Sequence, residues 1–552
     1  MARGLDLTYD KITVPNGITL FELAEKNSGF TLTSTHGNPD RRTAAFKGWI
    51  AARQSRAAGS PRDIAVEMGE KGVSPDKKLD VTYKGYGHGS VADGARIDVH
   101  FNGVPMIIPF TLFNRGYINS GQEKSTRYQT EFSDKPLHGA EFYLPADMDL
   151  ATLNNINEKY QKIGKTQLDA FSSFLESVKE RYEGFYGTPK NRAQKGAFTS
   201  RSLDTARFML LMGQNTGFAF ETSARDWERH IAFAKGHDMH IFQRTGYLLN
   251  QLLAPDNFIE NEFGLQAEAP TLIKYTKPNR TTVNLLNELK SIEIEKYSHP
   301  STRKLPNKQK TKVYDDNAQE KAMENFLMAV NPALASQKKI QKYVNQLSRA
   351  ERAQLSEQVY SAYTHHDELP SLARTTGLTA SLETQLGEIR DWNRHKSVGR
   401  FIHGIPAMYG LGLDKSMAHD MIQNGYGIPS YLAIEAMSTL ADVYNTHMNK
   451  HYEAVHSFME TLRQEVGTDA DYSIMQNLLP LGHTARIDMH MTPQDISYIT
   501  KLRVRPGGHI NYREQAFDIA EKFAKHDPFL SGLALKDDKP DAASPEQFYN
   551  RS

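Results

Sequence analysis

Apolar residues alternate with polar ones in several short stretches of this chain, and two of these stretches lead into a helix start signal. In residues 205–253 an apolar run and a strand pattern precede a long helical pattern, for which Ser223 is the predicted N-cap and Asp226 the capping-box acid. Residues 473–523 repeat this order, with Thr492 as N-cap and Asp495 as the acid. The repetition indicates an internal duplication in a mixed α/β protein.

A further strand is predicted where Ile97, Val99 and Phe101 alternate with polar residues, ahead of the apolar stretch GVPMIIPFTLF and a polar loop. The hexapeptide ARIDVH at 95–100 returns as ARIDMH at 485–490. These two copies fall at different places in the two layouts. We therefore interpret their identity as coincidence and not as part of the duplication.

The length of 552 residues exceeds what one hydrophobic core usually supports, so two domains are expected. A basic stretch that is poor in large apolar residues lies between the two repeated layouts. We predict a first domain at 1–265, a basic and partly irregular connector at 266–320 and a second domain at 321–530. The remaining residues, 531–552, have the composition of a tail with little fixed structure.

Composition excludes several classes of chemistry. The chain has no cysteine, so disulfides, thiolate metal sites and thiol nucleophiles are ruled out. A formal net charge of +1 argues against a large surface for duplex nucleic acid. No apolar run reaches the length of a membrane span or forms a signal-peptide core, so a cytoplasmic protein is expected. His237 and His240 lack a carboxylate pattern around them, so no metal site is predicted.

One polar segment, NSGQEKSTRY at 119–128, is suited to a nucleotide. It supplies a carboxylate, a hydroxyl, a guanidinium and a phenol from Glu123, Ser125, Arg127 and Tyr128. Such a polar set can hold a phosphate group and a base. We read this segment as a loop.

A second segment, IRDWNRHKSVGRF at 389–401, places Arg394, His395 and Lys396 in a row behind Trp392. A cationic cluster beside an aromatic residue fits a ligand site, and it equally fits a solvated helical face with charge pairs. Arg207 stands inside an apolar run, where an unpaired charge is costly, so it is either ion-paired or a phosphate ligand. The RPGGH segment at 505–509 is typical of a plain turn.

These segments resemble the flavin-dependent thymidylate synthase family, which is unrelated to the cysteine-dependent enzyme. Members carry an Arg-His-Arg triplet, then a loop that ends in Ser-x-Arg-Tyr, with a His-x-Ser segment upstream. EKSTRY at 123–128 is similar to that loop end, AARQS at 51–55 to an N-terminal family segment, and GHGSVAD at 87–93 to the His-x-Ser segment. LLPLGHT and ITKLRVR are similar to C-terminal family segments. The resemblance covers most of the chain apart from the connector and tail.

The chain departs from the family pattern in a complementary way. The first half keeps the loop but has Arg115, Gly116 and Tyr117 at the triplet positions, whereas the second keeps a triplet and has a shortened loop, SVGRF. Arg207 in the first half and Arg503 in the second stand where the family has nucleotide-contacting arginines. The second half has no arginine that corresponds to Arg207, and the first half has none that corresponds to Arg503. The resemblance thus implies one site that is assembled from both halves.

For activity, the resemblance implies FAD-dependent reductive methylation of dUMP to dTMP, with methylenetetrahydrofolate and NADPH as co-substrates. Family members are homotetramers, so two chains would form a pseudo-tetramer. The implied catalytic residues are Glu123, Ser125, Arg127 and Arg207. The implied substrate-binding residues are Ser125, Arg127, Tyr128, Arg207 and Arg503. The implied cofactor-binding residues are His88, Ser90, Arg115, Arg394, His395 and Lys396.

Two alternatives stay open. A flavoenzyme of the same fold could act on another pyrimidine nucleotide or transfer a hydroxymethyl group. A protein of a different class could bind flavin or nucleotide without turnover. Substrate competition separates the first alternative from the leading hypothesis, and complementation of a thymidine-requiring host separates the second.

Overall fold

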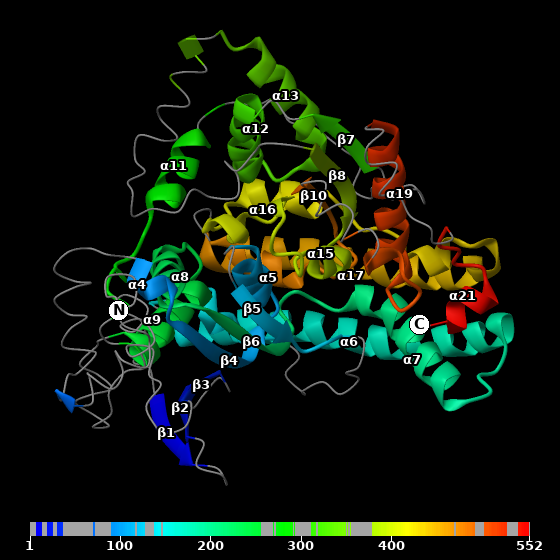
Figure 1. The fold of residues 1–552 in the computed structure, drawn as a ribbon, viewed down its shortest axis with the longest axis horizontal. Coiled ribbons are helices and arrows are strands. Elements are labelled where there is room, and N and C mark those ends of the chain that lie inside the picture. The colour runs from blue at the N-terminus through cyan, green and yellow to red at the C-terminus, as the bar shows by residue number, and fades with distance from the viewer. Residues whose placement is uncertain are drawn as a thin grey trace.

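The protein is described by a computed structural model that covers residues 7–13, 19–25, 30–36, 70–71, 90–115, 119–126, 137–144, 147–254, 269, 272–290, 292, 311–315, 318–348, 350–351, 354, 378–467, 471–491, 499, 502–526 and 539–550. This part of the chain contains two antiparallel sheets and several long helices (Figure 1). The mixed α/β prediction is therefore confirmed. We refer to residues 1–265 as the first half and 321–530 as the second half.

The first half contains a sheet of six strands in the order β1-β2-β3-β4-β6-β5. Their bounds are β1 Leu7–Thr13, β2 Thr19–Glu25, β3 Thr31–His36, β4 Arg96–Pro105, β5 Asn119–Glu123 and β6 Asn215–Ser223. Ile97, Val99 and Phe101 of β4 are buried as the alternation predicts. Part of the segment read as a loop is in fact strand β5. That reading was wrong because the polar residues of β5 gain backbone partners from β6, whose presence no local pattern signals.

The second sheet has four strands in the order β7-β8-β10-β9. Their bounds are β7 Thr311–Asp315, β8 Leu378–Gln385, β9 Gly399–His403 and β10 Thr484–Met491. The three-strand units β4-β6-β5 and β8-β10-β9 have the same order and the same antiparallel pairing. ARIDVH lies in β4 and ARIDMH in β10, which are not matching strands, so the interpretation of that identity as coincidence agrees with the topology.

Helices cover both sheets. In the first half they are α4 Ser90–Asp93, α5 Ile107–Asn114, α6 Leu150–Tyr186, α7 Arg192–Ala206, α8 Ala224–Gly236 and α9 His240–Leu253. After it come α11 Thr281–Leu289, α12 Ala318–Val330, α13 Gln337–Gln346, α15 Leu386–Trp392, α16 Lys415–Ile422, α17 Ser438–Val466, α19 Ile510–His526 and α21 Pro545–Tyr549. Ser223 caps α8 by accepting from the Asp226 N–H at 3.1 Å, which confirms that prediction. Thr492 and Asp495 lie outside the described residues.

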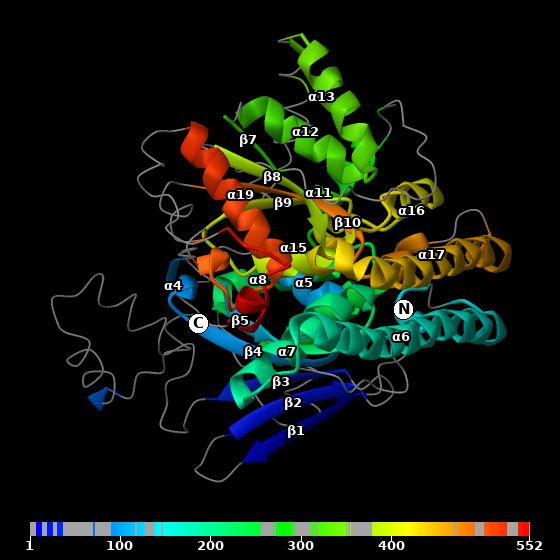
Figure 2. The same ribbon diagram turned by 90° about the vertical axis from the view of Figure 1, so that its right-hand side faces the viewer.

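The two longest helices, α6 and α17, pack side by side (Figure 2). The Tyr160 and Phe458 rings lie 6.0 Å apart, and the Phe174 and Tyr444 rings 5.8 Å apart. These pairs join the start of one helix to the end of the other, so the helices run antiparallel. None of the described helices combines the length with the apolar character that crossing a bilayer demands.

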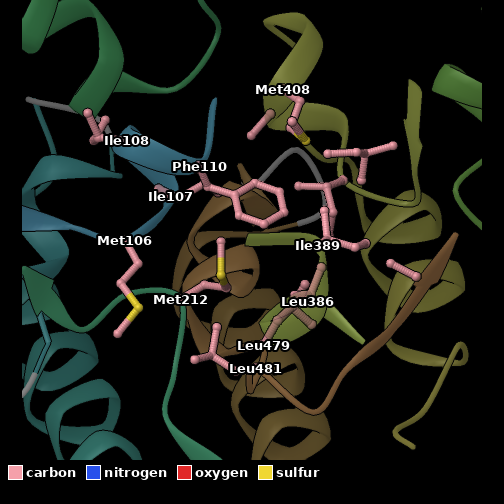
Figure 3. Packing of buried hydrophobic residues seen from close by; sticks show 14 of the residues in the cluster. Met106, Ile107, Ile108, Phe110, Met212, Leu386, Ile389, Met408, Leu479 and Leu481 are labelled. Atoms are coloured by element: carbon pink, nitrogen blue, oxygen red, sulfur yellow. The ribbon is translucent and has the colours of Figure 1, made fainter. Parts of the chain in front are cut away.

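The two halves meet along a backbone contact that we term the seam, between residues 208–213 and 477–482. Gly213 N–H donates to the Asn477 carbonyl at 2.7 Å, and Gly482 N–H donates to that of Phe208 at 2.6 Å. Apolar side chains from α5, α15 and the seam itself pack around this contact (Figure 3). The halves therefore share one hydrophobic core and are not two separate domains joined by a linker.

Residues predicted as connector and tail also contain regular structure. The connector range holds α11, β7 and the start of α12, and β7 pairs with β8 as the edge of the second sheet. In the tail range, α21 buries Phe548 against α6 and α7. The expectation of little fixed structure there was wrong for 539–550, because Tyr182, Tyr186 and Phe198 of the first half provide an aromatic surface that composition cannot reveal.

Candidate functional site

Helix α15 is the scaffold of the candidate site. Its first turn is fixed by Glu388, whose buried carboxylate accepts from the Gln385 N–H at 2.7 Å and from Asn511 Nδ2 at 2.5 Å. The hydroxyl of Thr384 also donates to it. Burial raises the pKa of Glu388, and these donors oppose the rise by favouring the charged form. A helix start held by a buried carboxylate leaves little freedom for the residues that follow.

At the other end of α15, three arginines surround Asp391. Arg207 Nη2 donates to Asp391 Oδ2 at 2.9 Å, and Arg394 Nη2 lies 3.8 Å from Oδ1. Arg503 Nη2 donates to the Asp391 carbonyl at 3.1 Å. Burial by itself would raise the pKa of Asp391, but the guanidinium groups of Arg207, Arg394 and Arg503 hold it well below its usual range. We call Arg207, Arg394 and Arg503 the arginine cluster.

The arginine cluster carries more positive charge than Asp391 neutralises. Arg207 is only 4% exposed, and its Nε has no hydrogen-bond partner among the described residues. Arg394 is 58% exposed, so the cluster opens to solvent on its side. A buried donor without a partner beside an open cationic end is the arrangement expected of an anion site. Of the two interpretations of Arg207, the structure contains the ion pair, and the Nε of Arg207 is not used by it.

His395 is held as an acceptor. Its Nε2 accepts from Arg503 Nε at 2.5 Å, and the ring is buried. Burial, together with the charges of Arg503 and Arg400, lowers the pKa of His395 to about 3. The imidazole is therefore neutral at physiological pH and helps to orient Arg503.

The structure brings the two motifs of the sequence into direct contact within one chain. Arg390 of α15 pairs with Glu123 at the end of β5, with 2.6 Å between Nη2 and Oε1. Lys396 donates to the Asn119 carbonyl at the other end of β5. The pKa of Lys396 is lowered, first by burial and then by Arg400 and other nearby cations. Arg390 and Lys396 thus belong to an interface, whereas Arg394 between them is exposed to solvent.

Two further contacts fix this interface. Asn393 Nδ2 donates to the Phe110 carbonyl at 3.3 Å. Arg400 Nη2 donates to the Phe113 carbonyl at 3.1 Å, and burial lowers the pKa of Arg400 to about 10. Both carbonyls belong to α5, so the second half docks on the helix that leads into β5. Sequence reasoning missed Arg390, Asp391 and Arg400, although all three lie in or beside the segment that it singled out.

Other predicted site residues stand apart from this interface or cannot be placed. The guanidinium of Arg115 lies 3.5 Å from the ring centroid of Phe233 in α8, a cation–π contact within the first half. Ser125 is partly buried just beyond β5. Ser90 begins α4, but its side chain is not described. His88, Arg127 and Tyr128 lie outside the described residues.

The described residues fit the phosphates of a flavin dinucleotide better than its ring system. Arg394 and Lys396 are at least partly exposed cations, the type of donor that binds a diphosphate. Trp392 is buried and donates to Gln515 at 2.7 Å, so it cannot stack on an isoalloxazine ring without moving. His88 and Arg127 would have to complete such a site.

Comparison with known proteins gives no activity. The chain is similar to a UPF0159 protein of Chlamydia pneumoniae, with 21% identity over 451 residues, which is 80% of this chain and 77% of that protein. The name of that protein states no function. No family model matches the chain.

Proposed function

We propose that this protein is a flavin-dependent enzyme that methylates dUMP to dTMP. The observation that carries the proposal is the contact of β5, which leads into the nucleotide-type segment, with the cationic segment 390–396. A site divided between two halves requires this contact. Methylenetetrahydrofolate as carbon donor, NADPH as reductant and pairing of two chains into a pseudo-tetramer belong to the same proposal.

In this proposal Arg207 and Arg503 of the arginine cluster bind the nucleotide phosphate. Arg207 and Arg503 approach Asp391 from opposite halves of the chain, and both are oriented by contacts that the ligand does not supply. Such preorganisation reduces the side-chain entropy lost on binding. Arg127, Ser125 and Tyr128 would contact the rest of the nucleotide, and Glu123 keeps their segment attached to Arg390.

The cofactor would be held by Arg394 and Lys396 through its phosphates, with His395 setting the position of Arg503 beside it. Bound FAD would supply the hydride chemistry. The chain has no cysteine, so it cannot form a thiol adduct with the pyrimidine. The protein residues supply binding, orientation and exclusion of water. The neutral His395 is a hydrogen-bond acceptor in this arrangement and not a proton donor.

Visible absorption of the purified protein with added FAD, followed by titration with dUMP, tests the proposal. We expect a flavin band that shifts as dUMP binds. Arg207→Ala should weaken dUMP binding at least about tenfold, because one charge-assisted hydrogen bond contributes about 1.5–3 kcal/mol. Arg463→Ala is the matched control, since Arg463 pairs with Glu460 on the surface of α17.

A protein that remains colourless with FAD would refute the proposal. Retained flavin binding without turnover on dUMP would favour the non-catalytic alternative. Rescue of a thymidine-requiring host then separates a slow enzyme from a binding protein, because binding alone cannot support growth. Competition by dCMP would redirect the substrate assignment to another pyrimidine nucleotide.

A further inference from the structure

The hydrogen bonds across the seam are reciprocal. Met212 N–H donates to the Leu479 carbonyl at 2.9 Å, and Leu481 N–H donates to that of Leu210 at 2.7 Å. Leu211 and Pro480 form the bridge between these two bonds. A two-fold axis produces such a pattern, because it turns each hydrogen bond from one strand to the other into an equivalent bond in the opposite direction. It matches Leu210 to Leu479 and Met212 to Leu481 residue by residue.

The helices beside the seam can be matched in the same way. Met106 and Ile107 donate their N–H groups to the carbonyls of Gln214 and Met212, at 3.1 and 3.2 Å. Leu386 and Gly387 donate to His483 and Leu481, at 3.1 and 2.8 Å. Ile107 therefore corresponds to Gly387. Helix α5 and helix α15 then align without a gap.

This alignment pairs residues of the candidate site with counterparts in the other half of the chain. Arg390 corresponds to Phe110, Asp391 to Thr111, Arg394 to Asn114 and His395 to Arg115. Counting from the seam and from the matched strands β6 and β10, Arg207 corresponds to Gln476 and Arg503 to Ala234. The local two-fold axis thus generates a second position, with matching backbone contacts along the seam and at the starts of α5 and α15.

The second position has lost the anion-binding character. The four arginines Arg207, Arg390, Arg394 and Arg503 are replaced there by Gln476, Phe110, Asn114 and Ala234, all of them buried. Gln476 uses its side chain inside the core, where its Oε1 accepts from the Ala407 N–H at 3.0 Å. Arg115 adds a cation at this position, and its guanidinium lies over the Phe233 ring.

The connector closes this second position. Val283 of α11 is 2% exposed, and both it and Phe233 lie so close to Gly410 that a Cβ there would meet Val283 at 2.7 Å and Phe233 at 3.3 Å. Arg280, just before α11, donates to the Gly236 carbonyl at 3.0 Å and pairs with Asp238 at 2.7 Å. These contacts hold α11 over the end of α8, where the counterpart of Arg503 lies.

We infer that each chain has one anion site along the seam, at the arginine cluster, and that its two-fold counterpart is a buried position that lacks this cluster and is covered by α11. The inference rests on the proposed function only for the identity of the natural ligand. The count of sites follows from the charges and the packing. Two associated chains would then hold two such sites and not four.

Equilibrium dialysis of the full chain against radiolabelled inorganic phosphate tests the count. Binding to surface cations is subtracted by measuring Arg207→Ala in parallel. We expect one equivalent of phosphate per chain to be lost in Arg207→Ala and also in Arg503→Ala. Gln476→Met and Thr111→Val change the counterpart position, and both should retain that equivalent with an unchanged dissociation constant.

Two equivalents lost in Arg207→Ala, no equivalent lost, or a loss in Gln476→Met comparable to that in Arg207→Ala would each overturn the inference. Either counterpart variant suffices if the other does not fold. Addition of dUMP then separates this inference from the proposed function. A single phosphate site that dUMP does not displace would refute nucleotide binding there and leave the count intact.

Discussion

Asp391 sets the charge of the candidate site. It is 8% exposed and faces three guanidinium groups, so it acts as their internal counter-ion. An incoming phosphate must share these guanidinium groups with Asp391. We predict that Asp391→Asn lowers the free energy of unfolding by about 3 kcal/mol, since removing one member of a buried ion pair leaves the remaining charge uncompensated. Millimolar phosphate should restore a large part of this loss, as measured by urea unfolding with and without the anion.

Asp488→Asn is the matched control for Asp391→Asn. Asp488 is also buried and pairs with Arg486 and His403 in the second sheet, away from the arginine cluster. The Asp488→Asn variant should lose stability, and phosphate should not restore it. Equal recovery in both variants would show that phosphate acts on the protein as a whole and would contradict the role of Asp391.

Glu514 in α19 gives the protein a pH dependence of known sign. Burial raises the pKa of Glu514 from its usual 4.5 to about 7, with Glu388 adding to the rise and the Ser430 hydroxyl opposing it. Between pH 4.5 and about 7 the folded chain therefore keeps a proton on Glu514 that the unfolded chain has released. The free energy of unfolding thus falls as the pH rises through this range.

We predict that Glu514→Gln removes this fall. Relative to the unchanged protein, the variant should gain on the order of 2 kcal/mol in going from pH 5 to pH 8, because the neutral amide never has to ionise in the core. Urea unfolding at the two pH values measures the effect. Glu521→Gln, at an exposed position of the same helix, should leave the pH dependence unchanged. Parallel curves for Glu514→Gln and the unchanged protein would contradict the assignment.

At the scale of elements, the short helix α21 joins the C-terminal residues to the first half. The Phe548 ring stacks on Tyr186 with 3.8 Å between centroids and meets Tyr182 edge-on at 5.4 Å. Arg201 of α7 is 1% exposed and donates to carbonyls of the turn at Pro506 and Gly508 as well as to that of Phe548. RPGGH is therefore a turn, as predicted, and its carbonyls bind a side chain.

We predict that Phe548→Ala lowers the free energy of unfolding by about 3 kcal/mol, the usual cost of truncating a buried phenylalanine. Phe185→Ala is the matched control, because Phe185 is 39% exposed on the neighbouring helix α6 and should cost less than about 1 kcal/mol. Both are measured by urea unfolding. Similar losses in the two variants would mean that α21 is not part of the folded core.

Elements with a strong local pattern were predictable from sequence. The alternation at 97–101 is confirmed by the burial of its apolar residues, and the cap at Ser223 by its hydrogen bond to the Asp226 N–H. Both features depend on spacing over only a few residues. The strand at 119–123 and the helix at 545–549 were not predicted. Their polar or short sequences become regular only through β6 and through the aromatic surface of α6 and α7.

At the scale of the whole molecule, the two halves form one body with a local two-fold axis. The seam, the antiparallel pair α6 and α17, and the matching strand orders all follow this axis. The side chains at the ends of α5 and α15 do not follow it, since the end of α15 lies at the arginine cluster whereas the end of α5 has Thr111 and Asn114, which are buried. Common backbone with divergent side chains is what an internal duplication followed by specialisation would produce, and we retain the duplication as a hypothesis.

The sequence by itself determined the mixed fold class, the repeated layout and the two polar segments, because hydrophobic period and capping residues act over a few positions. It also identified Arg394, His395 and Lys396 without assigning them partners. Only the tertiary structure decided that this triplet meets β5, that Asp391 gathers three arginines and that α11 closes the counterpart position. These contacts join residues hundreds of positions apart, and such pairs depend on how helices and sheets pack and not on any local spacing.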